Sequence, residues 1–212
     1  MCDIIRRNRT ICVTEHVKNI KTIIFASNNE SKIKEVKSIL GDKINVLSMG
    51  EAGLELDIAE TGTTFEENAI LKAEAVFDKL KMPVIADDSG LEVDFLGGEP
   101  GVHTAMYHKY GDAKGNNQKL LSNLRGVCDR NAKFVCVIAY IDEKCELHTI
   151  KAVAKGEITH EEKGQNGFAY DSVFYSFELG KTFAEASDDE KNSVSHRGKA
   201  IKSLLNSVLC VT

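Results

Sequence analysis

The sequence predicts an α/β protein with a mixed β-sheet flanked by helices. Short apolar runs, such as residues 22–27 and 83–89, are typical of buried strands. Apolar residues three and four positions apart, as in residues 65–80, are typical of helices with one buried face. Residues 134–141 and 147–158 flank a short polar turn and predict an antiparallel hairpin.

The length, composition and net charge of the chain exclude some classes of protein. A chain of 212 residues with 42% apolar side chains has the length and composition of a globular protein with a sizeable core. Its net charge of −5 disfavours a protein that coats a nucleic-acid polymer. No apolar run approaches the roughly 18 residues that a membrane-spanning helix needs. We therefore expect no membrane association.

The ends and the cysteines indicate a cytoplasmic protein. Residues 1–20 are broken by charges, lack the apolar core of a signal peptide and are interpreted as an N-terminal extension. None of the six cysteines has CxxC spacing, which disfavours a zinc ribbon or a thioredoxin-like site. Free thiols in a reducing compartment are the simpler interpretation.

The first half of the domain predicts two strand–helix pairs. A strand at 22–27 is followed by helix-capping residues and by a helix whose apolar residues include Ile33, Val36 and Leu40. A second strand is expected at 44–49. The next helix carries its apolar stripe within 65–80, behind a capping box at Thr63–Glu66.

Lys72 lies only about 20° from Phe65 on that helix, at the edge of the buried stripe. A cation in such a place needs a partner. The alternative is a snorkelling lysine whose ammonium group reaches water, and the pattern alone does not separate the two.

The second half predicts the rest of the sheet. The segment 91–96 continues the 83–89 strand or pairs with it, and glycines with Pro100 mark a turn at 97–101. A short helix is expected at 117–124. The hairpin and a short strand at 173–177 follow, and the final helix carries an apolar stripe of Ile201, Leu204, Leu205, Val208 and Leu209.

Four polar clusters could carry chemistry. Ser27–Lys32 joins a strand to a helix start, where backbone N–H groups and a lysine suit an anion, although it is not a P-loop. Asp87 and Asp88 end an apolar strand, and their oxygens suit Mg²⁺ or Mn²⁺. Strand alternation places these two side chains on opposite faces, so one of them points into a given cleft. The alternative for Ser27–Lys32 is a helix that is merely capped, and the alternative for Asp87 and Asp88 is a polar turn.

The other two clusters combine aromatic, acidic and basic groups. Residues 164–171 join flexible glycines to an aromatic plane and to a carboxylate, which can stack on a base and accept from its edge. Residues 191–197 supply the fixed donors of a histidine and an arginine. The alternative for residues 164–171 is a glycine loop whose aromatic side chains pack in the core. The alternative for residues 191–197 is a helix start with surface charges.

In this order the clusters resemble the Ham1-like inosine/xanthosine triphosphate pyrophosphatases, over residues 22–206. The matching segments are FASNNESKIKEV, AETGTTFEENAILKAEA, PVIADDSGLEVDFLGGEPGVHTA, NGFAYDSVF, KTFAEA and EKNSVSHRGKAI. The resemblance implies an elongated mixed α/β fold in which residues 21–212 form one domain with two lobes and a central cleft. It also implies a homodimer that hydrolyses the α–β phosphoanhydride of ITP, dITP and XTP with Mg²⁺.

The resemblance also assigns roles to residues. Asp88 matches the catalytic acid position and, with Glu60, the acids near the metal. Lys72 matches a catalytic lysine with a phosphate partner. The positions that match substrate contacts are Ser27, Asn28, Asn29, Lys32, Lys72, Ser89, Phe168, Ala169, Tyr170, Asp171, Lys191, His196 and Arg197.

Two positions depart from the family pattern. The first loop commonly reads Thr-Gly-Asn, and Asn28 stands here at the glycine; asparagine tolerates a positive φ, so we expect the turn to persist. The other loop commonly reads Phe-Gly-Tyr-Asp, and Ala169 replaces its glycine. If that position requires a positive φ, alanine is strained there and a shifted loop is expected.

The mechanism expected from these roles has two parts. Asp88 orients or deprotonates the attacking water, while Lys32 and Lys72 stabilise the pyrophosphate leaving group. Phe168 stacks on the base, Asp171 accepts from its edge, and donors from 195–197 favour a 6-oxo purine over adenine. The alternatives are a Maf-like nucleotide pyrophosphatase of other specificity and a non-catalytic nucleotide-binding module.

Overall fold

A computed structural model describes residues 22–41 and 44–209. The predicted extension at 1–20 lies outside the described residues, as do Cys2, Cys12 and Cys210. Within the described residues, no helix is both long and apolar enough to cross a membrane.

The strands form one mixed seven-stranded sheet in the order β2-β1-β3-β4-β5-β6-β7, which confirms the predicted fold class. β1 pairs in parallel with β2 and β3, and the later pairings are antiparallel. The strands are β1 (Thr22–Phe25), β2 (Asn45–Ser48), β3 (Val84–Val93), β4 (Asn131–Ile141), β5 (Leu147–Ile158), β6 (Phe174–Ser176) and β7 (Lys181–Thr182).

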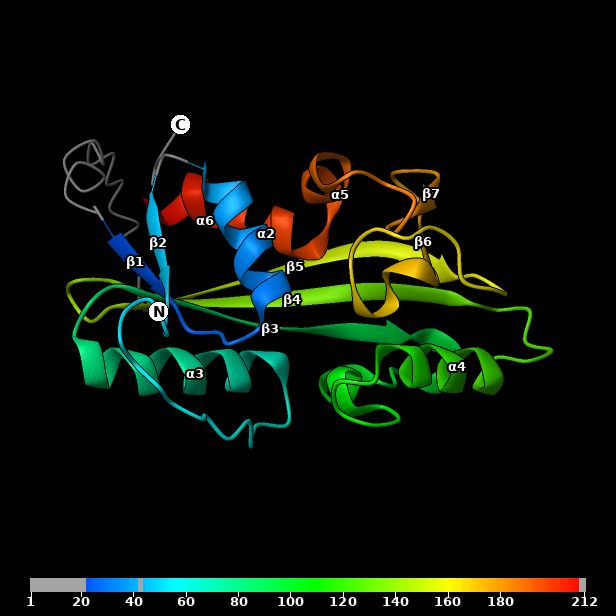
Figure 1. The fold of residues 1–212 in the computed structure, drawn as a ribbon, viewed down its shortest axis with the longest axis horizontal. Helices are drawn as coiled ribbons and strands as arrows, with labels where there is room; N and C mark the ends of the chain where they lie inside the picture. Colours follow the sequence, from blue (N-terminus) through cyan, green and yellow to red (C-terminus); the bar gives the residue numbers. More distant parts are fainter. Residues whose placement is uncertain (1–21, 42–43, 210–212) are drawn as a thin grey trace, which may run out of the picture.

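Helices cover both faces of this sheet (Figure 1). α3 and α4 lie on one face, and α2, α5 and α6 lie on the other. The α-helices are α2 (Glu30–Leu40), α3 (Phe65–Leu80), α4 (Ala113–Asn123), α5 (Asp188–Val194) and α6 (His196–Leu204). Short 3₁₀ turns occupy Asp94–Leu96, Gly101–Met106 and Ala169–Ser172, and a π turn occupies Leu205–Leu209.

The long strands β3, β4 and β5 run the length of the molecule in Figure 1. β1, β2, α2 and α3 gather at one end of them, and β6, β7 and α4 gather at the other. Apolar clusters fill the space under α2 and α6, under α3, and around β6. Cys136 is fully buried in the first cluster, as a small apolar residue would be.

The capping box of α3 lies one residue later than predicted. Thr64, not Thr63, is the N-cap: its hydroxyl accepts from the Glu67 backbone N–H. The Glu67 carboxylate, not that of Glu66, accepts from the backbone N–H groups of Thr63 and Thr64. The motif Thr-Thr-Phe-Glu-Glu permits either register, and Thr64 takes the extended backbone that an N-cap requires.

Other boundaries also differ from the prediction. Residues 91–93 continue β3, and the strand ends at Val93 where a 3₁₀ turn begins. α4 begins at Ala113 because Asp112 caps it through the Gly115 N–H, four residues before the expected start. The apolar stripe that ends at Leu209 continues past α6 into the wider π turn.

Candidate functional site

Asp87 and Asp88 lie on a stretch of β3 that β1 does not cover. β1 pairs with β3 at Ile24↔Val84 and Phe25↔Ile85, and the chain then leaves the sheet toward α2. Ligands in α/β folds commonly bind beyond the carboxyl ends of parallel strands. Asp87 and Asp88 lie on β3 just past the carboxyl end of its parallel neighbour β1. The candidate site is therefore built around this part of β3.

On the α3 face, Asp88 belongs to a buried charged group. Lys72 Nζ donates to Asp88 Oδ1 at 3.1 Å and to Glu60 Oε1 at 2.7 Å. The amide of Asn68 donates to Asp88 Oδ2 at 3.3 Å. Lys72 is only 7% exposed, so the snorkelling interpretation is wrong. One ammonium group faces two carboxylates, which leaves this group with a surplus of negative charge.

The pKa values on this face follow from burial and charge. Burial raises the pKa of Asp88 above its usual range, although Lys72 and Lys32 act in the opposite direction. Burial lowers the pKa of Lys72, but the carboxylates, Asp88 foremost, outweigh this effect and raise it. The lysine therefore keeps its charge at neutral pH and can stabilise an anion.

On the opposite face, Asp87 binds two cations. Lys32 Nζ on α2 donates to Asp87 Oδ1 at 3.1 Å, and Arg197 Nη2 on α6 donates to Oδ2 at 2.9 Å. Arg197 Nη2 also donates to Ser89 Oγ at 2.8 Å. Burial alone would raise the pKa of Asp87, but Lys32 and Arg197 hold it well below its usual range. The predicted alternation is confirmed, since Asp87 and Asp88 have partners from different faces.

Glu35 on α2 joins these groups to the end of the molecule that carries β6. Its carboxylate accepts from Arg197 Nη1 and, at 2.7 Å, from Lys191 Nζ. Lys191 also donates to Asp171 Oδ2 at 2.6 Å, and its ammonium group lies 4.8 Å from the centroid of the Phe168 ring. Contacts through Glu35 and Asp87 thus link five of the predicted site residues, namely Lys32, Phe168, Asp171, Lys191 and Arg197.

The loop before β6 has a rigid base. The Asp171 carboxylate also accepts from the Phe168 backbone N–H at 2.7 Å. Tyr170 packs in the apolar cluster around β6 and donates its hydroxyl to the Thr104 carbonyl at 2.9 Å. Tyr170 therefore supports the loop from beneath, whereas Phe168 is half-buried.

Ala169 has a φ of +52°, so this position does require the left-handed conformation. We expect Ala169→Gly to raise the free energy of unfolding by about 0.5–1 kcal/mol. Glycine removes the strain of the positive φ, and its greater conformational entropy in the unfolded chain offsets only part of that gain. Denaturant titration measures the change. The control Ala75→Gly, in the interior of α3, should lower the same free energy. A value for Ala169→Gly at or below that of the unsubstituted protein would contradict the strain.

The first loop keeps its turn without a positive φ. Among the described residues other than glycine, only Lys81, Cys145 and Ala169 have a positive φ, so Asn28 does not use the tolerance expected of it. Asn29 caps α2 by accepting from the Lys32 N–H, and its own N–H donates to Ser27 Oγ. The loop is exposed and lies at the end of β1.

His196 is a buried member of the same neighbourhood. Its ring stacks on Phe134 with centroids 4.7 Å apart. Burial, and then the cations Arg197 and Lys191, lower its pKa well below the usual value, so the imidazole is neutral. Its Nδ1 atom is buried without a hydrogen-bond partner among the residues described.

Sequence reasoning missed Glu35 and left Asp87 without a role. The only signal for Glu35 was its place one helical turn after Lys32, and many exposed glutamates share that spacing.

Two surface hollows lie away from the charged groups of Asp87 and Asp88, one between α3 and the end of the β4–β5 hairpin and one beside α4. The central cleft therefore stays a prediction.

The residues around Asp88 fit a divalent metal ion with a preference for oxygen. Asp88 and Glu60 bind the same ammonium group, and their charge exceeds that of Lys72 by one. Mg²⁺ is typically held by one or two carboxylates together with substrate phosphates and water. The donor set therefore suits Mg²⁺, while imidazole and thiolate ligands are absent from these contacts.

The chain is similar in sequence to proteins named dITP/XTP pyrophosphatase. The chain is 48% identical over 183 residues to a protein of Staphylococcus epidermidis named dITP/XTP pyrophosphatase, covering 86% of this chain and 93% of that protein. It is 45% identical to a protein of the same name from Clostridium perfringens, with coverages of 87% and 96%.

Solved structures agree with this. The Ham1 protein of Staphylococcus aureus superposes with a TM-score of 0.79 at 45% identity, covering 88% of this chain and 97% of that one. A HAM1 protein from Coxiella burnetii gives a TM-score of 0.80 at 38% identity, with coverages of 90% and 100%. The model of the Ham1 family matches residues 23–207, which contain both faces of the charged site. The chain therefore belongs to the Ham1 family.

Proposed function

We propose that this chain is a nucleoside triphosphate pyrophosphatase that hydrolyses the α–β phosphoanhydride of ITP, dITP and XTP. The products are the monophosphate and pyrophosphate, so the enzyme clears deaminated purines from the nucleotide pool. The observation that carries this proposal is the buried group of Asp88, Lys72 and Glu60, beside the Asp87 group on the other face of β3. The names of the relatives support the substrate class.

The cations bind and stabilise the phosphates. Lys72 keeps its charge although it is buried, and a buried charge acts more strongly than one in water. Lys32 is partly exposed, and its backbone N–H donates to Asn29 in the loop of Ser27, Asn28 and Asn29. We assign the triphosphate to this loop and the charge of the leaving pyrophosphate to the two lysines.

Asp88 is assigned the attacking water. Burial has raised its pKa, which makes it a better proton acceptor than an exposed aspartate. Asn68 and Lys72 hold its two oxygens, so the carboxylate is fixed in orientation. Mg²⁺, or Mn²⁺, held by Asp88 and Glu60 would act as a Lewis acid toward the phosphates when bound.

The purine is assigned to the side of Phe168. Phe168 stacks on the base, and the edge of the base meets Asp171, Lys191 and the 195–197 segment, with Ser89 and Ala169 beside them. The donors of Arg197 already have Asp87, Ser89 and Glu35 as partners. Discrimination of a 6-oxo purine from adenine through this segment, including His196, stays a prediction.

One assay tests the function. Pyrophosphate release is measured from ITP, XTP, dTTP and ATP, with and without Mg²⁺, and the nucleotide product is identified. We expect Mg²⁺-dependent release from ITP and XTP with intact monophosphate, and little from ATP. Preference for dTTP would favour the Maf-like alternative, and no release from any substrate would favour the binding module.

We also propose a homodimer in the cytoplasm. Phe95, Met106 and Tyr110 are large apolar side chains that are more than half exposed, and a second copy of the chain would cover them. Sedimentation equilibrium should give the mass of two chains, and Met106→Glu should lower it to that of one.

The exposed thiols of Cys128 and Cys145 are typical of a reducing compartment, which supports the cytoplasmic location.

A further inference from the structure

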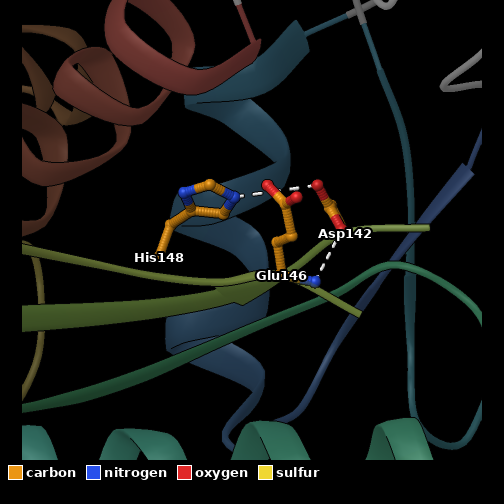
Figure 2. Close-up of side chains that lie close together, drawn as sticks. All are labelled: Asp142, Glu146 and His148. Carbon is orange, nitrogen blue, oxygen red and sulfur yellow. Dashed lines mark hydrogen bonds and ion pairs between the residues drawn. The ribbon is translucent and has the colours of Figure 1, made fainter. Parts of the chain in front are cut away.

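The end of the β4–β5 hairpin gathers Asp142, Glu146 and His148, at a distance from the Asp87 and Asp88 groups along the sheet. One ligand atom from each lies within 4.8 Å of the others, so the three described residues could together hold a metal ion. Figure 2 shows the three side chains pointing toward one another above the hairpin. The proposed nucleotide chemistry uses none of them.

The Asp142 carboxylate is held in place from one side. Its Oδ1 atom accepts from the backbone N–H groups of Lys144 and Glu146, each at 2.8 Å. Oδ2 faces Nε2 of His148 at 3.7 Å, which is too long for a hydrogen bond. Two ligand atoms on one tetrahedral zinc ion are about 3.4 Å apart, since each bond is about 2.1 Å long. The separation therefore fits an ion between them.

Two unsatisfied polar atoms adjoin this position. Nε2 of His148 is shielded from solvent and lacks a hydrogen-bond partner in the described part of the chain. Its ring stacks on Tyr140, directly opposite in the strand register, with centroids 5.9 Å apart. Tyr140 is 1% exposed, and its hydroxyl is likewise without a partner among the residues described. Unpaired buried polar atoms cost free energy, and a metal on Nε2 would remove one such cost.

The carboxylates of Asp142 and Glu146 lie close together at the hairpin end. Among the contacts described, no lysine or arginine is bonded to either of them. A dication would compensate this charge.

We propose that Asp142, Glu146 and His148 form a second metal site, selective for Zn²⁺ or a similar transition metal. One imidazole nitrogen with two carboxylates suits zinc, whereas Mg²⁺ prefers oxygen ligands alone. Glu146 is exposed, so its side chain can rotate to complete the set, and water takes the fourth position. The ion ties the first residues of β5 to the turn that follows β4.

Calorimetric titration of the metal-stripped full-length chain with ZnCl₂ tests the site. We expect His148→Ala to weaken one Zn²⁺ binding event at least tenfold, and Glu146→Gln to weaken the same event. The controls are His160→Ala, a histidine outside the cluster, and Cys145→Ser, which removes the nearby thiol. Both controls should retain the event. The Mg²⁺-dependent hydrolysis of ITP should be unchanged in His148→Ala.

A second measurement separates this site from that of Asp88. Zn²⁺ should raise the thermal midpoint of the unsubstituted chain and of Asp88→Asn by the same amount, and should not raise that of His148→Ala. Equal Zn²⁺ affinity in His148→Ala and in the unsubstituted chain would overturn the proposal. Loss of the event in Cys145→Ser or in Asp88→Asn would also overturn it, because the ion would then bind elsewhere.

Discussion

Asp88→Asn should lower kcat for ITP hydrolysis by at least about a hundredfold while the protein stays folded. An amide cannot accept the proton of the attacking water, and it carries no charge toward a metal ion. The fold should persist because asparagine has the same shape and Lys72 keeps Glu60 as its partner at 2.7 Å. Steady-state kinetics and the circular dichroism spectrum measure the two effects.

The matched control is Asp78→Asn. Asp78 lies on α3 as Lys72 does, but it is exposed, and its ion pair among the described residues is with Lys81 at the surface. This change should leave kcat within about twofold, because exposed ion pairs contribute little. Near-normal turnover of Asp88→Asn would remove Asp88 from the chemistry and leave it as a binding residue.

Arg197→Ala should lower the free energy of unfolding by about 3–5 kcal/mol. The guanidinium is 2% exposed and bonds to Asp87, Ser89 and Glu35. Its removal leaves the fully buried Asp87 with Lys32 as its remaining ion-pair partner among those described. Urea unfolding gives the difference.

Arg125→Ala provides the control, since Arg125 is exposed and its loss should cost less than about 0.5 kcal/mol. Arg197→Lys should recover part of the stability, because the charge remains and the forked geometry is lost. If Arg197→Ala does not fold, the partial loss in Arg197→Lys still reports the pair. A change below about 1 kcal/mol in Arg197→Ala would show that Asp87 is satisfied without it.

The local pattern of the sequence predicted much of the site. Alternation along a strand placed Asp87 and Asp88 on opposite faces, and helical spacing placed Lys72 at the edge of a buried stripe. Both inferences depend only on neighbours within a few residues, where backbone geometry is regular. They hold because β3 and α3 are uninterrupted over these positions.

What the sequence could not predict depends on contacts between distant segments. Glu35 meets Lys191 and Arg197 across more than 150 positions, and nothing near Glu35 distinguishes it from an exposed glutamate. Tyr170 is itself one of the residues assigned to the substrate, yet it is 1% exposed and its ring packs in the apolar cluster around β6. The capping box was displaced by one residue because the repeated Thr and Glu allow two registers.

The position of two acids side by side on β3 has a consequence for how this protein can vary. The side-chain direction along a strand has a period of two, so deleting one residue before Asp87 would exchange the two acids between faces. Asp88 would then face Lys32 and Arg197, and Asp87 would take the present position of Ala86, in the apolar cluster under α3. The carboxylate that we assign to the attacking water and the one that Lys32 and Arg197 hold are the same residue type, and they differ only in the face of β3 from which they point. A change in the length of β3 before Asp87 would therefore disturb both charged groups at once.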